Sequence, residues 1–477
     1  MRRLLPVLAL LVCACATIPR ADLGTSPPEF ATFRDAVKTP DAGDEAIRLL
    51  SGYLQVDTSN PPGNETLGAK YLAGILEKEG IASEIVEFAP GRGSLMARLK
   101  GNGTEKPLCL LSHLDVVPAE AKNWQQPPFS GLIDKDGMIW GRGALDMKGM
   151  GLLETLTLVW LKRLHVPLKR DVILLAVGDE EVDNRGMLHV VEKYWTQIGC
   201  SHVVNEGGMG IRDAMTPGQT IYAISVAEKG LLWLKMIAHG KAGHGSTPIP
   251  GRAPERLLKA LDKIRARHPP AIWHDSMRET LAQVGHDVGG VTGYVLKRPT
   301  LQNWLAEGQL MANPGPAAAM TDTVNITGFG GADEPNVVPA DVWAHLDCRL
   351  LPGHKPLDLL ADLQKLVDDP NIRFEVLHKA DANESPWDDP FYRALARHAV
   401  AGKQNAVAGP VLSPGFTDSL HLRPLGARAY GFVPFATTQA ETGSMHGENE
   451  RVSSENVRDG LHVLFSAVVD VAATSGN

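Results

Sequence analysis

The stretch Trp140-Gly141-Arg142-Gly143-Ala144-Leu145-Asp146-Met147-Lys148-Gly149 places one carboxylate in a glycine-rich bend. The flanking segments 108–112 and 171–177 are apolar runs typical of buried strands, and residues 149–164 repeat apolar side chains at helical spacing. Alternating strands and helices predict an α/β sheet, in which ligands gather beyond the carboxyl ends of the strands. The titratable residues that follow predicted strands are His113, Asp115, Glu180, Glu181 and Glu206. We therefore expect Asp146 to face a crevice lined by these side chains.

Length and composition indicate a large globular protein. The chain has 477 residues, which is longer than a domain built on a single hydrophobic core usually is, so two or more domains are expected. Its hydrophobic content of 44% and charged content of 21% are those of soluble globular proteins. The net charge of −8, with no basic tract, argues against a nucleic-acid partner.

The N-terminal residues are typical of an export signal. Arg2 and Arg3 precede an apolar run over residues 4–12, which is too short to span a bilayer. The run ends in Val12-Cys13-Ala14-Cys15, which resembles a bacterial lipobox with Cys15 as the acylated residue; an ordinary cleaved signal peptide is the alternative. We expect residues 1–15 to be the signal and 16–40 a tether. The protein is then an exported, periplasmic lipoprotein of a bacterial cell envelope, held to the membrane by its lipid anchor only.

Cysteine usage gives little support for a disulfide-based fold. After the signal only Cys109, Cys200 and Cys348 remain. Three cysteines do not make a disulfide framework, so the fold must rest on its core. Each of them is expected to fill core space.

The pattern changes after about Ala227, which indicates an inserted second domain. Strands are predicted over 231–238, 323–329, 342–350 and 372–377, and helices over 254–267 and 356–367. Their order, βαββαβ, is that of a split βαβ sandwich. We therefore expect a first domain made of residues 41–226 and 382–477, and an inserted domain over 227–381. Residues 269–322 form an extra excursion to which no structure is assigned.

Adjacent carboxylates suggest metal-assisted hydrolysis. Glu180 and Glu181 cannot point the same way, so one can bind a metal while the other deprotonates water. Asp115 could orient His113 through its second ring nitrogen, although a capping aspartate beside a surface histidine is an equally good interpretation. His446, in the polar loop 443–450, could supply a nitrogen ligand to a second metal.

Three competing motifs are missing from the sequence. There is no His-Glu-x-x-His zinc helix and no Gly-x-Ser-x-Gly nucleophile elbow. Asp146 stands where a dinucleotide fingerprint needs glycine, which argues against NAD.

Taken together, these motifs resemble a known family. The set consists of Ser112-His113-Leu114-Asp115, the stretch 141–149, Gly178-Asp179-Glu180-Glu181, Asn205-Glu206-Gly207-Gly208 and His446-Gly447. It is similar to the di-zinc family of aminoacylases, glutamate carboxypeptidase and succinyl-diaminopimelate desuccinylase. Residues 227–230 (Ala-Glu-Lys-Gly) and 416–419 (Phe-Thr-Asp-Ser) most resemble its carboxypeptidase S branch, which includes enzymes acting on N-acyl amino acids.

The resemblance implies a mixed-sheet zinc-hydrolase domain that carries two Zn²⁺ ions, with Co²⁺ or Mn²⁺ as substitutes. Asp146 would bridge the two ions. His113 and Glu206 would complete one site, and Glu181 and His446 the other. Glu180 would be the general base, and Asp115 would orient His113.

The resemblance also implies a substrate site shared between subunits. His244 would stabilise the oxyanion from a partner subunit, so the inserted domain would serve as a lid and form a homodimer. Arg349 and Asn336 would hold the substrate's carboxylate and polar groups, and Gly415 and Thr417 would line the pocket.

The sequence thus predicts a hydrolase that cleaves an amide bond next to an amino acid with a free carboxylate. Its substrate would be a small peptide or an N-acyl amino acid, which makes it a carboxypeptidase, a dipeptidase or a deacylase. Two alternatives are a non-catalytic envelope lipoprotein that uses the same fold as a binding module, and a hydrolase that works with one metal.

Overall fold

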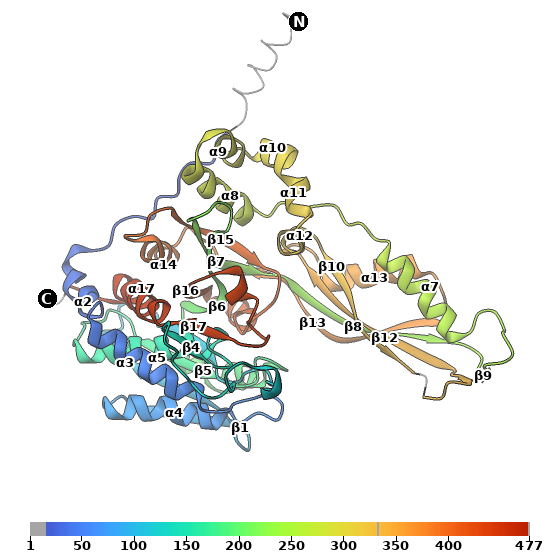
Figure 1. The fold of residues 1–477 in the computed structure, drawn as a ribbon, viewed down its shortest axis with the longest axis horizontal. Helices are drawn as coiled ribbons and strands as arrows, with labels where there is room; N and C mark the ends of the chain where they lie inside the picture. The colour runs from blue at the N-terminus through green and yellow to red at the C-terminus, as the bar shows by residue number, and fades with distance from the viewer. Residues whose placement is uncertain (1–15, 332, 476–477) are drawn as a thin grey trace, which may run out of the picture.

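The computed structural model describes residues 16–331 and 333–475, and these residues form two large sheets and two short two-stranded ones (Figure 1). The predicted signal and Cys15 lie outside the described residues. The mixed α/β architecture confirms the expected fold class. Within the described residues, no helix combines the length and the apolar character needed to cross a membrane.

The larger sheet is mixed and has nine strands in the order β1-β2-β5-β3-β6-β16-β7-β14, with β15 paired to β7. Its strands are β1 (Ser83–Ala89), β2 (Arg92–Leu99), β3 (Leu108–His113), β5 (Val172–Val177), β6 (His202–Arg212), β7 (Thr220–Glu228), β14 (Asn383–Glu384), β15 (Ala406–Ser413) and β16 (Arg428–Thr437). The pairs β5–β3, β3–β6 and β6–β16 are parallel. The carboxyl ends of β5 and β3 therefore lie side by side, next to the middle of β6, which continues to Arg212.

Helices cover both faces of this sheet, which explains the unbroken apolar runs. They are α3 (Pro40–Leu54), α4 (Glu65–Lys78), α5 (Lys148–Arg163), α6 (Arg185–Ile198), α14 (Pro390–Val400) and α17 (Ser454–Ala472). Leu108 and Leu110 of β3 join the core beneath α5 and α17, whereas Cys109 and Leu111 join the core on the α6 side. A strand buried on both faces needs apolar residues at every position.

All three cysteines lie in hydrophobic cores, as predicted, but the sequence did not predict that two of them are bonded to each other. Cys109 on β3 and Cys200 just before β6 form a disulfide, with Cα atoms 5.9 Å apart. The two strands are parallel neighbours, so residues 91 positions apart in the sequence lie side by side. Cys348 is a buried free thiol, as expected.

The smaller sheet is antiparallel, in the order β10-β12-β8-β13. Its elements are β8 (Gly230–His239), α7 (Ala253–Arg265), β10 (Thr323–Gly330), β12 (Asp341–Leu350), α13 (Pro356–Val367) and β13 (Ile372–Ala380). Both helices pack on the sheet through one apolar core. A short ladder of β9 (Gly243–His244) with β11 (Val337–Val338) forms the outer tip, far from the larger sheet (Figure 1).

The excursion over residues 269–322 is helical. It contains α8 (Asp275–Val288), α9 (Gly290–Leu296), α10 (Pro299–Leu301), the π-helical turn η3 (Gln302–Ala306), α11 (Glu307–Met311) and α12 (Pro314–Met320). Leu281 and Val284 of α8 pack against Val407 of β15, so this part of the excursion contacts the larger sheet.

The second half of the segment predicted as a tether, residues 16–40, is folded. It contains η1 (Pro28–Phe30) and α2 (Ala31–Ala36), and Phe30 and Val37 are buried in the main core, whereas residues 16–27 form no helix or strand. Local composition does not predict this packing, because α2 contacts α17, which is distant in sequence. The remaining short elements are η2 (Ala121–Asn123), β4 (Met138–Trp140), α15 (Ser419–Leu422), η4 (Arg423–Leu425), α16 (Gln439–Thr442) and β17 (Arg451–Ser453).

Candidate metal centre

Two groups of candidate ligands meet where β3 and β5 end, beside Glu206 in the middle of β6. One group is His113, Asp146 and Glu206; the other is Asp146, Glu181 and His446. Within each group the candidate ligand atoms all lie within 4.8 Å of one another. Asp146 belongs to both: Oδ1 lies 2.9 Å from Nε2 of His113, and Oδ2 lies 3.0 Å from Nε2 of His446. The structure thus brings together all five residues predicted as ligands.

The orientation of His113 is set by the main chain. Its Nδ1 donates a hydrogen bond to the carbonyl oxygen of Asp115, at 2.9 Å. Because a carbonyl oxygen only accepts, Nδ1 carries a hydrogen and Nε2 is the nitrogen that faces Asp146 and Glu206. The ring is therefore presented as a metal ligand with its second nitrogen held, the usual arrangement in such sites.

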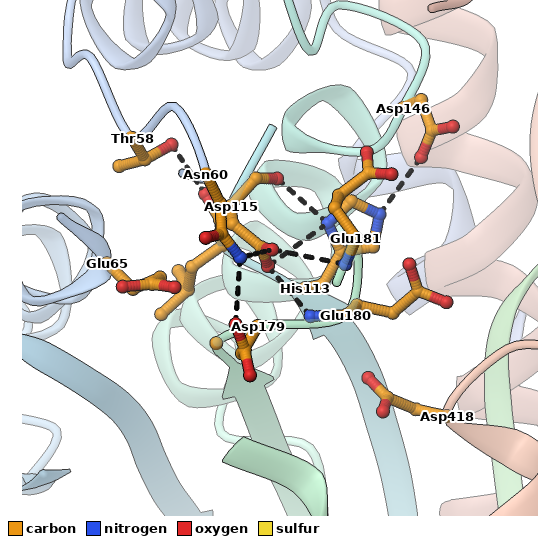
Figure 2. A network of polar contacts seen from close by, with 12 residues as sticks. Thr58, Asn60, Glu65, His113, Asp115, Asp146, Asp179, Glu180, Glu181 and Asp418 are labelled. Carbon is orange, nitrogen blue, oxygen red and sulfur yellow. Dashed lines mark hydrogen bonds and ion pairs between the residues drawn. The ribbon is translucent and has the colours of Figure 1, made fainter. Parts of the chain in front are cut away.

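The carboxylate of Asp115 does not bond to His113, the residue it was predicted to orient. Its Oδ1 is 3.8 Å from Nδ1 of His113, too far for a hydrogen bond. Instead it accepts from the backbone N–H groups of Glu180 and Glu181, both at 3.1 Å, and from the Asn60 side chain at 2.9 Å (Figure 2). Asp115 thus ties the end of β3 to the turn that carries the two adjacent glutamates.

Those two glutamates diverge, as adjacent residues must. Figure 2 shows Glu181 on the side of Asp146, whereas Glu180 turns toward Asp418. Oε1 of Glu181 is buried and lies 3.2 Å from Nε2 of His446, yet among the described residues it has no hydrogen-bond donor. A buried carboxylate oxygen without a donor is costly unless a cation faces it. This orphaned atom shows that the site fits a metal ion.

Electrostatics support the same conclusion. Burial raises the pKa of Glu180 well above its usual range, and the nearby Glu206 adds to the shift. Burial also raises the pKa of Glu206, reinforced by Asp146. The pKa of His446 rises to about 10 because its ring lies beside the carboxylates of Asp146 and Glu181. The acids are too concentrated to share one pocket without positive charge, and carboxylates with imidazoles are common ligands of zinc and other transition metals.

Glu450 holds the glycine-rich bend, a role that no motif in the sequence indicates. Its buried carboxylate accepts from the backbone N–H groups of Gly143, Leu145 and Asp146, at 2.8 to 3.2 Å. Arg142 donates to the same carboxylate at 2.7 Å. Gly143 has φ +87°, and a Cβ there would lie 2.8 Å from Val116. The bend therefore needs both this glycine and a distant acid to present Asp146.

The predicted substrate residues divide into two groups, and the first lies beside the loop 413–419. Arg349 pairs with Asp347 and places its guanidinium 5.0 Å from the ring centre of Phe416. Thr417 is buried and donates to Glu228 at 2.6 Å, so its hydroxyl fixes the loop. Gly415 is half-buried in the same loop.

Asp418, in the same loop, was not predicted as a site residue. It is buried, accepts from Asn184 at 3.1 Å and faces the cluster in Figure 2. Burial raises the pKa of Asp418 to about 7. Its side chain thus adds a further acid to the edge of the cluster.

The second group of predicted substrate residues, His244 and Asn336, lies far from the cluster. His244 is exposed on β9 and bonds only locally, through Nδ1 to the Ser246 hydroxyl at 2.8 Å. Asn336 lies beside it, with its carbonyl accepting from Gly245 at 2.7 Å. Both residues sit at the outer tip of the smaller sheet (Figure 1), so the chain alone does not bring them to the cluster.

Comparisons with known proteins agree with this geometry. The model described as Peptidase family M20/M25/M40 matches residues 109–470. The human N-fatty-acyl-amino acid synthase/hydrolase PM20D1 is 27% identical over 491 residues, covering 97% of this chain and 95% of that protein. Mouse aminoacylase-1 is 26% identical over 450 residues, covering 92% and 99%. The solved structure of the M20 family metallo-carboxypeptidase Sso-CP2 from Sulfolobus solfataricus has a TM-score of 0.69 at 22% identity, covering 90% and 99%. That likeness shows the same fold.

Zinc titration of chelator-treated protein should separate the two groups of ligands. Asp146→Ala should weaken both binding events, because Asp146 faces both histidines. His113→Ala and His446→Ala should each weaken mainly one of the two binding events. The zinc affinity of that event should fall by at least roughly 10- to 100-fold, because even the loss of a residue that hydrogen-bonds to a ligand has an effect of this size.

The control is His239→Ala, which changes an exposed histidine on β8. Calorimetry should show two zinc-binding events in both the control and the parent protein. A single event in the parent protein would indicate a one-metal enzyme and contradict the shared role of Asp146.

Proposed function

Because the chain belongs to peptidase family M20/M25/M40, we propose that it is a metal-dependent deacylase that releases an amino acid from an N-acyl amino acid. The observation that carries the proposal is the pair of ligand groups sharing Asp146, with Glu180 beside them. The family supports amide hydrolysis, and the two curated relatives named above support the N-acyl class over peptides. The non-catalytic alternative is dropped, because neither a ligand nor the general base is missing.

His113, Asp146 and Glu206 would hold one metal ion, and Asp146, Glu181 and His446 the other. We assign zinc, since imidazole and carboxylate ligands suit it, with Co²⁺ or Mn²⁺ as substitutes. A pair of such ions lowers the pKa of a water molecule and polarises an amide carbonyl.

Glu180 performs the proton transfers in the proposed reaction. Its carboxylate takes a proton from water, and the oxygen attacks the acyl carbon. Glu180 then gives that proton to the amide nitrogen as the carbon–nitrogen bond breaks, leaving a free carboxylate and an amino acid. The raised pKa of Glu180 suits a group that must both accept and return a proton near neutral pH.

Arg349 would bind the carboxylate of the amino acid. Its Nε and one hydrogen of Nη2 donate to Asp347, which leaves the second Nη2 hydrogen and the Nη1 donors to face a ligand. A guanidinium pairs with carboxylates in a planar, two-point geometry that lysine does not reproduce.

His244 would act in a homodimer. It lies beyond β8, whose ten residues span about 33 Å at the usual rise of a strand. A partner subunit bound through the smaller sheet could deliver this histidine and Asn336 to the metal site. The imidazole would then donate to the oxyanion, a contribution of roughly 3 kcal/mol to catalysis.

We also propose that the protein is exported and anchored through Cys15, on the strength of the apolar run and the lipobox-like residues before it. Retention of a palmitate label by the wild-type protein and its loss in Cys15→Ser would support this localisation. Labelling that persists without Cys15 would contradict it.

Glu180→Gln should reduce kcat by at least about 10²-fold, because a general base contributes this much or more. Its zinc content should be unchanged, since Glu180 belongs to neither ligand group. Glu84→Gln, on the exposed edge of β1, is the matched control and should retain full activity. Near-normal turnover of Glu180→Gln would refute the mechanism.

Substrate class can be tested by pairing N-acyl amino acids with dipeptides and with the corresponding N-acyl amino acid amides. We expect the N-acyl amino acids to have the highest kcat/KM and the amides, which lack the carboxylate, the lowest. Arg349→Lys should reduce the difference in kcat/KM between the N-acyl amino acids and their amides, because lysine cannot make the two-point pairing with a carboxylate. If Arg349→Lys leaves the ratio of kcat/KM for acid over amide unchanged, Arg349 does not bind the carboxylate.

The partner-subunit role of His244 can be tested by mixing two inactive variants. A Glu180→Gln chain supplies His244, and a His244→Ala chain supplies Glu180, so mixed dimers contain one complete site. Random reassortment of a two-fold dimer should restore about a quarter of the wild-type activity. Activity no greater than the sum of the separate variants, with a monomer by light scattering, would rule this role out.

A further inference from the structure

The helical excursion carries an exposed apolar surface at one end of the molecule. We call it the apolar patch: Val291 on α9, and Trp304 and Leu305 on η3. Their side chains are 83%, 86% and 59% exposed. All nine tryptophans lie in the described part of the chain, and Trp304 is the only one of them that is exposed. Exposed aromatic and aliphatic groups gathered in one place mark an interaction surface.

The start of the described chain is fastened beside this patch. The backbone N–H of Ile18 donates to the carbonyl of Lys297, at 2.9 Å, just after α9. The Gln283 side chain of α8 bonds to Pro19 and Ala21, and His286 bonds to the carbonyl of Ile18. Residues 18–21 are therefore held against α8 and α9.

This attachment limits where an N-terminal membrane anchor could be. Ile18 is three positions after Cys15, so the chain can carry Cys15 at most about 11 Å from Ile18, which is held just after α9. A bilayer holding a lipid on Cys15, or holding the apolar residues 4–12, must then approach α9 and η3. Figure 1 shows α9, α10 and α11 together at one end of the molecule, opposite α3 and α4 and away from β9.

The charge around the patch fits an anionic lipid surface. Residues 288–306 contain two basic side chains, Lys297 and Arg298, and no acidic one, although the whole chain has a net charge of −8. The flanking acids are engaged elsewhere: Asp287 accepts from Gln219, and Glu307 accepts from Trp273. Basic residues near a membrane are attracted to its anionic lipids.

A cavity of about 760 Å³ opens beside the patch, and Val291 and Leu305 are among its lining residues. Leu281, Leu296 and Leu310 line it further in. The apolar surface thus continues below the exposed side chains, as suits contact with hydrocarbon chains.

We propose that the apolar patch lies in the membrane interface and is a second membrane contact next to the N-terminal anchor. Tryptophan prefers this interface because its ring is apolar and its N–H is polar. A single lipid chain binds membranes reversibly, and stable attachment takes a second contact. The proposal rests on the N-terminal anchor, and it replaces our expectation that the lipid anchor alone attaches the protein. It orients the excursion toward the bilayer and leaves the tip at β9 free for a second subunit.

The test uses the full chain reconstituted into vesicles of phosphatidylglycerol and phosphatidylcholine with brominated acyl chains. Bromine quenches the fluorescence of tryptophans that enter the interface. Wild-type protein should be quenched, and Trp304→Phe should lose this quenching while it keeps its turnover of a soluble N-acetyl amino acid. The matched control is Trp343→Phe, which changes a half-buried tryptophan on β12 and should be quenched like the wild type.

Three outcomes would overturn the proposal. Equal quenching of the wild type and Trp304→Phe would show that Trp304 stays outside the bilayer. Failure of the full chain to sediment with vesicles would contradict both proposed membrane contacts, the N-terminal anchor and the apolar patch. The deacylase proposal would not be affected by that result. Protection of Trp304 from acrylamide in lipid-free solution would show that a second copy covers the patch instead.

Discussion

Mutual repulsion among buried carboxylates is the constraint on which the rest of the structure depends. Asp146, Glu180, Glu181 and Glu206 converge on one edge of a sheet, with only two imidazoles, His113 and His446, among them. Such a cluster is stable only with protons or cations between the acids. The fold concentrates it there because β3 and β5 end side by side next to the middle of β6, which carries Glu206. His113 and the pair Glu180 and Glu181 come at or just after the end of an apolar strand, and Glu206 follows the buried Val203 and Val204.

Holding this cluster takes a second layer of buried polar contacts. Asp115 spans from the end of β3 to the backbone of Glu180 and Glu181, and Glu450 closes the bend before Asp146. Each carboxylate accepts several N–H groups, so neither can be replaced by an apolar residue without leaving those donors unpaired. The geometry of the ligands therefore depends on residues that would touch neither metal nor substrate.

The sequence predicted the elements with strong apolar periodicity well. The helix expected over residues 149–164 runs from 148 to 163, and the strand expected over 171–177 runs from 172 to 177. The helices of the excursion over 269–322 are not predictable from the sequence, because its Gly, Pro and Ala content hides the helical pattern and its helices are only partly buried.

Contacts between distant segments could not be predicted from local patterns. The Cys109–Cys200 bond requires that β3 and β6 be neighbours, and the pairing order of strands is not visible in the sequence. The clamp of Glu450 on residues 143–146 spans more than 300 positions. The ligand set was found because a known family carries the same residues in the same order, whereas no motif marks the residues that hold those ligands in place.

The connection between the two sheets is a short stretch held by buried polar contacts. Lys229, between β7 and β8, is buried, and its ammonium donates to the carbonyls of Ala318 and Thr321, so the start of β8 is held to the segment before β10. Its neighbour Glu228 pairs with buried Arg423 at 2.9 Å and accepts from Thr417. Removing one partner of such a buried pair costs several kcal/mol, on the order of 3–5. Adjacent residues therefore position the base of the smaller sheet and the loop that carries Thr417 and Asp418. The proposed dimer would use this connection as it stands, with His244 at the outer tip.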